Sequence, residues 1–114
     1  MIHYLIKVDI KHYKDDEFIG TMRTLSKKIR KEENCVRFEL YKDMEKDNAF
    51  TMVGVWKSRK AMENHFQNQN YKVMIGAAKV LGKSYEMKIA EILDKNGLEL
   101  VRDLSSLKSK PDTG

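Results

Sequence analysis

The sequence has a single cysteine, three histidines and few of the features that mark secreted, membrane or metal-binding chains. Cys35 has no partner for an internal disulfide, which is typical of a reducing compartment. Three scattered histidines and one cysteine do not make a metal site, so we expect no metal. No apolar run approaches the length needed to span a bilayer, and residues 1–7 lack the basic-then-apolar pattern of a signal peptide. We therefore expect a cytoplasmic protein with no membrane contact.

The formal net charge is +5, and the densest basic run is residues 27–31, Lys-Lys-Ile-Arg-Lys. Ile29 belongs to an apolar helical stripe, so its charged neighbours are interpreted as a solvated face. No module combining basic and aromatic residues is visible, and we expect no nucleic-acid partner.

Hydrophobic periodicity predicts alternating strands and helices in a single domain. Ile2, Tyr4, Ile6 and Val8 alternate with other residues, which is the pattern of a half-buried strand. By the same reasoning we expect strands at 2–9, 35–42, 49–57 and 84–93, and helices at about 14–31, after Trp56, and at 69–81 with Gly82 as a C-cap. With the last two helical pieces counted together, the order is β-α-β-β-α-β. This is the ferredoxin-like α+β pattern, a four-stranded antiparallel sheet with its helices on one face.

The third predicted strand is apolar on both faces. Helices cover one face, and we expect a second copy of the chain to cover the other in a symmetric homodimer. The alternative is a monomer whose C-terminal segment folds across that face. We accordingly expect a domain at 1–93, an arm or short amphipathic helix at 94–107 and a disordered tail at 108–114.

The spacing between Trp56 and His65 is the most informative functional feature. Ser58 is a good N-cap, and it predicts a new helix directly after the strand that ends near Trp56. His65 falls about two turns into that helix, on one stripe with Met62 and Phe66. An imidazole is thus expected to face an aromatic-lined interior, where a titrating group can do chemistry.

These residues also carry a resemblance to the antibiotic biosynthesis monooxygenase family of dimeric α+β barrels. The resemblance covers about residues 1–93. Its matching positions are 35–41, Cys-Val-Arg-Phe-Glu-Leu-Tyr, then Phe50 through Trp56, Lys57-Ser58, Ala61, His65 and Tyr71-Lys72. The family includes quinol and polyketide monooxygenases without metal or flavin, haem-degrading enzymes and an isomerase of a phosphorylated sugar. A shared fold does not fix the reaction.

The resemblance implies a cofactor-independent monooxygenase acting on a quinol-like or polycyclic aromatic substrate. His65 is the candidate catalytic base or anchor. The candidate pocket wall for a small apolar or aromatic ligand is Trp56, Phe66, Tyr71 and Met74. Each has a structural alternative. His65 could be hydrogen-bonded to a backbone carbonyl, Trp56 and Met74 could be core, and Tyr71 could belong to the core or an interface.

Three departures from the family pattern bear on which of the family's activities we expect of this chain. Gln69-Asn70 stand where many members have a Pro-His pair, which disfavours a two-histidine mechanism, including that of the isomerase. His65 stands where the haem-degrading branch has Trp, and Ile75 lies near the position of its axial His. Two other functions remain alternatives, a non-catalytic dimer that binds a small ligand and an isomerase of a small phosphorylated sugar.

Overall fold

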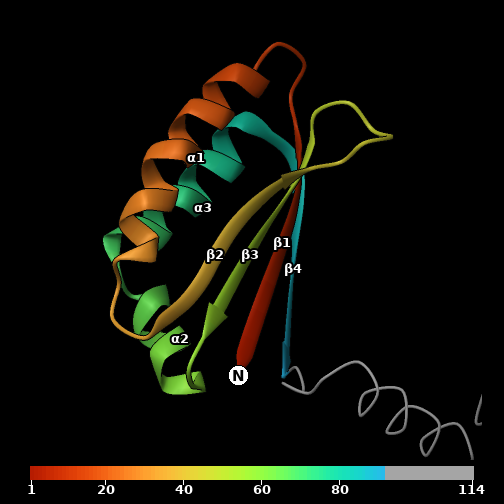
Figure 1. Cartoon of the computed structure of the whole chain (residues 1–114). Helices are drawn as coiled ribbons and strands as arrows, with labels where there is room; N and C mark the ends of the chain where they lie inside the picture. The colour runs from red at the N-terminus through yellow and green to blue at the C-terminus, as the bar shows by residue number, and fades with distance from the viewer. Residues whose placement is uncertain (92–114) are drawn as a thin grey trace, which may run out of the picture.

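A computed structural model of the chain describes residues 1–91, and Figure 1 shows a curved sheet with a layer of helices on one side. The predicted arm at 94–107 and the tail at 108–114 lie outside the described residues. The elements are, in order, β1 (Ile2–Ile10), α1 (Asp15–Arg30), β2 (Cys35–Lys42), β3 (Ala49–Trp56), α2 (Arg59–Phe66), α3 (Gln69–Leu81) and β4 (Gly82–Glu91).

Within residues 1–91 the strands form one antiparallel sheet in the order β2-β3-β1-β4, which confirms the ferredoxin-like α+β prediction. The two helical pieces predicted after Trp56 are the separate helices α2 and α3. Asn68 divides them, because its side-chain oxygen accepts a hydrogen bond from the Asn70 amide and caps the start of α3. Gly82 ends α3 as expected, but in an extended conformation that leads directly into β4.

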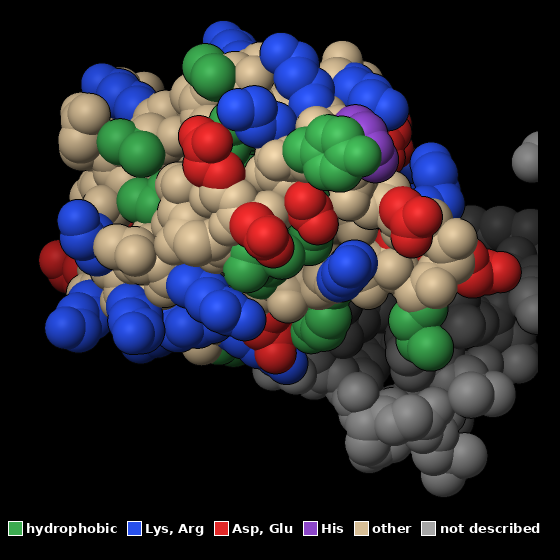
Figure 2. Space-filling view, turned by 90° about the horizontal axis from the view of Figure 1, so that it is seen from above, with side chains coloured by type: hydrophobic (Ala, Val, Ile, Leu, Met, Phe, Trp, Pro, Cys, Tyr) green, Lys and Arg blue, Asp and Glu red, His purple; other side chains and the backbone are tan. Residues whose placement is uncertain are grey.

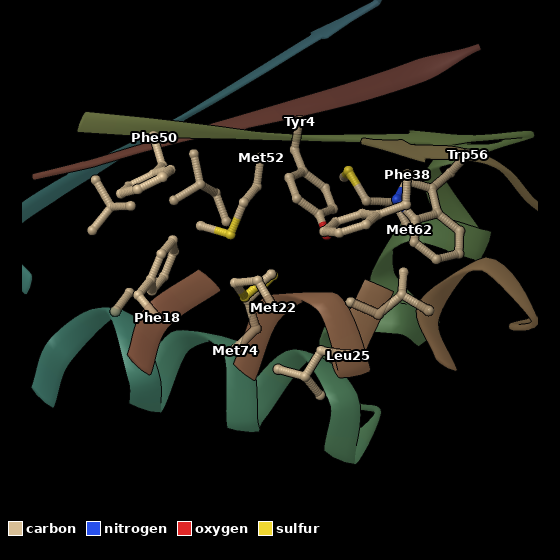
Figure 3. Packing of buried hydrophobic residues seen from close by; sticks show 14 of the residues in the cluster. Tyr4, Phe18, Met22, Leu25, Phe38, Phe50, Met52, Trp56, Met62 and Met74 are labelled. Atoms are coloured by element: carbon tan, nitrogen blue, oxygen red, sulfur yellow. The ribbon is translucent and has the colours of Figure 1, made fainter. Parts of the chain in front are cut away.

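The hydrophobic core lies between the sheet and the helices, as Figure 3 shows. The alternation that predicted β1 is what builds it, since Tyr4 and Ile6 point at the helices and are fully buried. Phe18, Met22, Leu25 and Ile29 form the matching stripe on α1. The end of the core nearest α2 holds Tyr4 and Trp56, which adjoin the candidate site, whereas Phe18 and Phe50 pack together at the other end.

No helix of residues 1–91 covers the opposite face of the sheet (Figure 1). Leu5 and Val53 are directly paired at its centre and are only partly buried. Glu39 is paired with Val53 on the far side, so charge lies beside this apolar centre. A partly exposed apolar centre of this kind is what the sequence predicted for the third strand.

The molecular surface is strongly charged. Figure 2 shows Lys and Arg side chains distributed around the rim of one end of the molecule, with carboxylates among them. This mixture agrees with the interpretation of the net charge as a solvated surface.

Candidate active site

His65 is buried at the junction of α2 with the sheet. Ser58 starts α2 as predicted, because its Oγ accepts a hydrogen bond of 3.1 Å from the Ala61 amide. Two turns later His65 lies on the buried face of this helix, next to Trp56 at the end of β3. The two rings are stacked with their centroids 4.3 Å apart. The inward orientation expected from the helical spacing is therefore what the structure has.

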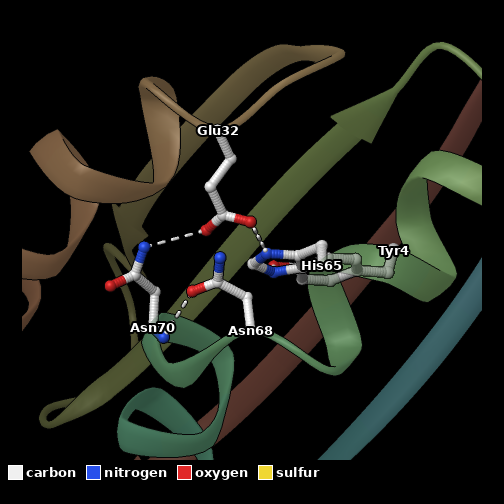
Figure 4. A network of polar contacts seen from close by, with 5 residues as sticks. All are labelled: Tyr4, Glu32, His65, Asn68 and Asn70. Carbon is white, nitrogen blue, oxygen red and sulfur yellow. Dashed lines mark hydrogen bonds and ion pairs between the residues drawn. The ribbon is translucent and has the colours of Figure 1, made fainter.

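Both ring nitrogens of His65 are hydrogen-bonded to side chains, and Figure 4 shows the bond to Glu32. Nδ1 lies 2.8 Å from Glu32 Oε1, and Nε2 lies 2.7 Å from the Tyr4 hydroxyl oxygen. A carboxylate can only accept, so Nδ1 carries the proton that it donates to Glu32. In the neutral ring Nε2 is then an acceptor, and the Tyr4 hydroxyl donates to it. The backbone-carbonyl alternative for His65 is not what the structure shows.

Glu32 is itself held in place. It lies two residues after the end of α1, and its second oxygen, Oε2, accepts a hydrogen bond of 3.1 Å from the Asn70 side-chain amide. Asn70 lies in the first turn of α3, anchored through its backbone amide to Asn68. The carboxylate therefore joins the ends of three helices. Asn70 occupies the corner where the sequence lacks a second imidazole.

Burial sets the protonation states of this group. Removal from water lowers the pKa of His65, and the hydrogen bond and charge of Glu32 oppose this only in part. Burial is also the main cause that raises the pKa of Tyr4, with smaller contributions from the charges of Tyr71, Glu32 and Cys35. The favoured state at neutral pH is thus a neutral imidazole between a neutral phenol and a carboxylate.

The four predicted wall residues fall into two pairs. Phe66 and Tyr71 are partly exposed and flank the Tyr4 ring, at centroid distances of 5.7 and 6.3 Å. Trp56 and Met74 are fully buried in the core (Figure 3). None of the four lines any of five clefts found among residues 1–91. A substrate contact for these four side chains stays a prediction.

The indole of Trp56 has one unusual property. Its Nε1–H is buried and has no hydrogen-bond acceptor among the described residues. Buried donors without an acceptor are rare, because each one loses its hydrogen bond to water. This N–H lies beside Gly54, where a Cβ atom would be 3.0 Å from Trp56 Nε1 and 2.6 Å from Tyr4 Cζ. An unused donor is therefore close to the phenol of Tyr4.

A cleft of about 230 Å³ reaches His65 from the side of Glu32. It differs from the aromatic pocket that we expected between the sheet and the helices, because large side chains fill that interior. The lining of the cleft is mostly polar and comprises Glu32, Glu33, Asn34, Ala61, Asn64, His65 and Asn68. It includes two carboxylates and no Lys or Arg, a charge pattern that repels a phosphate group. The cleft therefore gives no support to the phosphorylated-sugar isomerase.

The described part of the chain contains no group of three or more His, Cys, Asp or Glu side chains arranged to hold a metal ion. None of the helices in residues 1–91 is both long and apolar enough to cross a membrane.

Sequence reasoning identified His65 but missed its partners. The alternation of β1 placed Tyr4 in the core, and a phenol there needs a partner for its hydroxyl, so this signal was present. Glu32 lies just past the helix predicted at about 14–31 and was assigned no role, and Asn70 was interpreted only as a missing histidine. Nothing local in the sequence distinguishes either from a solvated side chain.

Fold and site together define an α+β protein that buries a carboxylate–imidazole–phenol group between its helices and its sheet. The family model described as antibiotic biosynthesis monooxygenase matches residues 1–77, and the chain belongs to this family.

Individual proteins show the same relationship. The uncharacterized protein sll1783 of Synechocystis is 30% identical over 92 residues, a match that covers 80% of this chain and 63% of the cyanobacterial protein. The chain therefore spans less than two thirds of that relative. A conserved protein from Methanosarcina mazei superposes with a TM-score of 0.75 at 24% identity, over 81% of this chain and 92% of its own. SnoaB, a cofactor-independent oxygenase from Streptomyces nogalater, superposes with a TM-score of 0.74 at 14% identity, over 84% and 96%. At these identities the two structures support the fold alone.

Proposed function

We propose that this protein is a cofactor-independent monooxygenase acting on a quinol-like or polycyclic aromatic substrate, with His65 as the proton-accepting centre. The observation that carries the proposal is the buried imidazole, which bonds to Glu32 on one side and Tyr4 on the other. Membership of a monooxygenase family supports the same reading, as does the likeness to a cofactor-independent oxygenase. A cytoplasmic location agrees with the lone cysteine, and it stays a prediction.

The chemistry requires an electron-rich substrate that loses a proton. A hydroquinone deprotonated in the site becomes an anion that reduces dioxygen. One oxygen atom is then inserted into the ring and the other leaves as water, so that a hydroquinone and O₂ give a hydroxyquinone and H₂O. The substrate supplies all the electrons. The protein has to accept the proton, hold the ring and exclude water from the reacting anion.

The surrounding side chains suit that task. Phe66 and Tyr71 are partly exposed aromatic surfaces that a flat ring would meet first. Trp56 lies deeper, and its free Nε1–H would donate to the substrate oxygen as negative charge develops there. Met74, buried in the core, would form the apolar floor behind them.

We also propose that two copies of the chain pair through the sheet face opposite α1 and α3. The support is the partly exposed Leu5–Val53 pair at the centre of that face. Burial of this centre by a second sheet would stabilise a symmetric dimer.

The test is oxygen uptake with a series of hydroquinones and anthrone-like phenols in metal-free buffer. We expect uptake by the unmodified protein and a loss of about 10²-fold or more in kcat for His65→Gln. His12→Gln is the matched control, because His12 is exposed near the end of β1. Undiminished turnover in a folded His65→Gln variant would contradict the proposal. Saturable binding of the same compounds without oxygen uptake would instead support a non-catalytic binding protein.

A further inference from the structure

We propose that Tyr4 is the catalytic residue that takes the proton from the substrate, and that His65 and Glu32 pass it on to the polar cleft. This inference rests on the proposed function and deepens it. It assigns roles to two residues and to a cleft that the sequence did not single out.

The first argument is that His65 has no free nitrogen. Its Nδ1 is bonded to Glu32 and its Nε2 to the Tyr4 hydroxyl. The imidazole is also stacked against Trp56, and its side chain has no exposed surface. A substrate could reach Nε2 directly only by displacing a phenol that is itself fully buried. On the side of the imidazole away from Glu32, the Tyr4 oxygen is therefore the atom of this group that a substrate would meet before Nε2.

The second argument is the position of the Tyr4 ring. Phe66 and Tyr71, the two partly exposed aromatic side chains of the site, pack against Tyr4. The unused Nε1–H of Trp56 lies near the same phenol, beside Gly54. A phenolic substrate that replaced water at Phe66 and Tyr71 would thus approach the hydroxyl of Tyr4 and a free donor for its own oxygen.

The proton transfer balances without any other reactant. The substrate O–H gives its proton to the Tyr4 oxygen as the Tyr4 proton moves to His65 Nε2. The proton on His65 Nδ1 moves in turn to Glu32 Oε1. The net result is a substrate anion, a neutral Tyr4, a neutral His65 in its other tautomer and a protonated Glu32. One negative charge has passed from Glu32 to the substrate, and no imidazolium remains in the apolar interior.

The third argument is the cleft, where the proton can pass from Glu32 to water. Glu32 has about 10% of its side chain exposed and lines the polar cleft together with His65. Asn70 holds the second carboxylate oxygen, which keeps Oε1 aimed at the imidazole. The acid formed on Glu32 can lose its proton to water at the cleft. The starting tautomer returns when a proton moves the opposite way, from Glu32 to Nδ1 and from Nε2 through Tyr4 to the hydroxide that leaves as water. The aromatic side of the site, at Phe66 and Tyr71, is accordingly separate from the polar cleft at Glu32.

Other titratable groups surround this chain of hydrogen bonds. Tyr71 on α3 and Cys35 on β2 lie near Tyr4, and their charged forms disfavour a Tyr4 anion. Glu33 lines the cleft beside Glu32. These neighbours oppose a stable phenolate, so Tyr4 acts as a carrier that receives one proton while it gives up another.

The experiment has two independent parts. In the first, NMR of the protein labelled with ¹⁵N-histidine, without substrate, reports the tautomer of His65. We expect a protonated Nδ1 and an unprotonated, hydrogen-bonded Nε2, with the Nε2 resonance moving toward that of a free acceptor in Tyr4→Phe. The opposite tautomer, with Nε2 protonated, would overturn the relay even if the protein proved to have no oxygenase activity.

In the second part, kinetics separates transfer through Tyr4 from a merely structural role. We expect Tyr4→Phe to lower kcat by about 10²-fold with little change in KM. We expect Glu32→Gln to lower kcat and to move the acid limb of the pH–rate profile to lower pH, because the group that raises the His65 pKa is lost. Tyr13→Phe and Glu63→Gln are the matched controls, since both residues are exposed. Circular dichroism checks that each variant is folded.

The outcomes distinguish the two proposals. Oxygen uptake that depends on His65 but is unchanged in folded Tyr4→Phe would overturn the relay and leave the proposed function standing. If Tyr4→Phe fails to fold, the acid limb in Glu32→Gln decides, and an unmoved limb counts against the relay. Absence of oxygen uptake in the unmodified protein would overturn the proposed function, while the tautomer measurement would still decide the hydrogen-bond order.

Discussion

Tyr4 and Gly54 are directly paired across β1 and β3, and the Tyr4 ring occupies the space that a side chain at position 54 would need. A Cβ atom added to Gly54 would lie 2.6 Å from Tyr4 Cζ and 2.7 Å from Cε2. These atoms belong to a rigid aromatic ring enclosed in the core, so they cannot move aside without displacing the phenol from His65. A missing side chain on one strand thus fixes the position of a hydroxyl on the next.

Gly54→Ala is therefore expected to destabilise the protein by about 1–3 kcal/mol, because it overpacks the core at Tyr4. Chemical denaturation measures the change. Gly20→Ala is the control, since a Cβ at Gly20 meets nothing within 4 Å and the residue lies inside α1. That control should stabilise the protein by about 0.5–1 kcal/mol through its helix propensity. Equal effects at both positions would mean that Tyr4 is not held as described.

The lowered pKa of His65 predicts a pH-dependent stability. Below about pH 6.5 the unfolded chain binds a proton at this residue, while the folded protein, with its lower pKa, does not. The free energy of unfolding should therefore be largest above pH 6.5 and fall as the pH drops toward the folded pKa. Thermal unfolding of the unmodified protein and of His65→Gln between pH 7.5 and 5 tests this, because every other titrating group is common to both. Parallel curves for the two proteins would contradict the assignment.

Met74 distinguishes core packing from an open pocket wall. Its side chain is fully buried between α3 and the sheet, so Met74→Ala should lower the free energy of unfolding by about 2–5 kcal/mol. Val80, on the same helix, is 68% exposed, and Val80→Ala should change stability by no more than about 0.5 kcal/mol. Urea denaturation provides both values. A small effect at Met74 would show that the side chain borders an empty space.

The proposed dimer predicts that a charge at the centre of the sheet face opposite the helices separates the subunits. Val53 is paired with Leu5 on one side and with Glu39 on the other. Val53→Lys would place an ammonium in the middle of the apolar contact, where burying it is unfavourable. In an isolated chain the same lysine can pair with Glu39, so the fold should survive. We expect light scattering to give twice the chain mass for the unmodified protein and the single mass for Val53→Lys. A dimer that persists in the variant would point to a different interface.

The residues around His65 illustrate how far local sequence signals reach. Ser58 predicted the start of α2, and helical spacing then placed His65 on the buried face, because capping and periodicity act within a few residues. Neither signal says what a buried imidazole will bond to. Its partners Tyr4 and Glu32 lie 61 and 33 residues away in the chain, and only the assembled fold brings them to either side of the ring.

The predicted pocket shows that sequence patterns do not determine how side chains pack. Trp56, Phe66 and Tyr71 lie around His65 in the fold. Sequence patterns do not measure how much of the intervening volume these side chains fill. In the fold they close the interior around His65, and the open space lies instead at the polar loop after α1.

By itself the sequence determined the order of strands and helices, the two faces of β1 and the inward direction of His65, because all of these follow from side-chain periodicity along a few turns or a single strand. Tertiary structure alone decided that the imidazole lies between a phenol and a carboxylate. That contact depends on the register of β1 against β3, on where α1 ends, and on the angle at which α2 meets the sheet, and long-range packing sets all three.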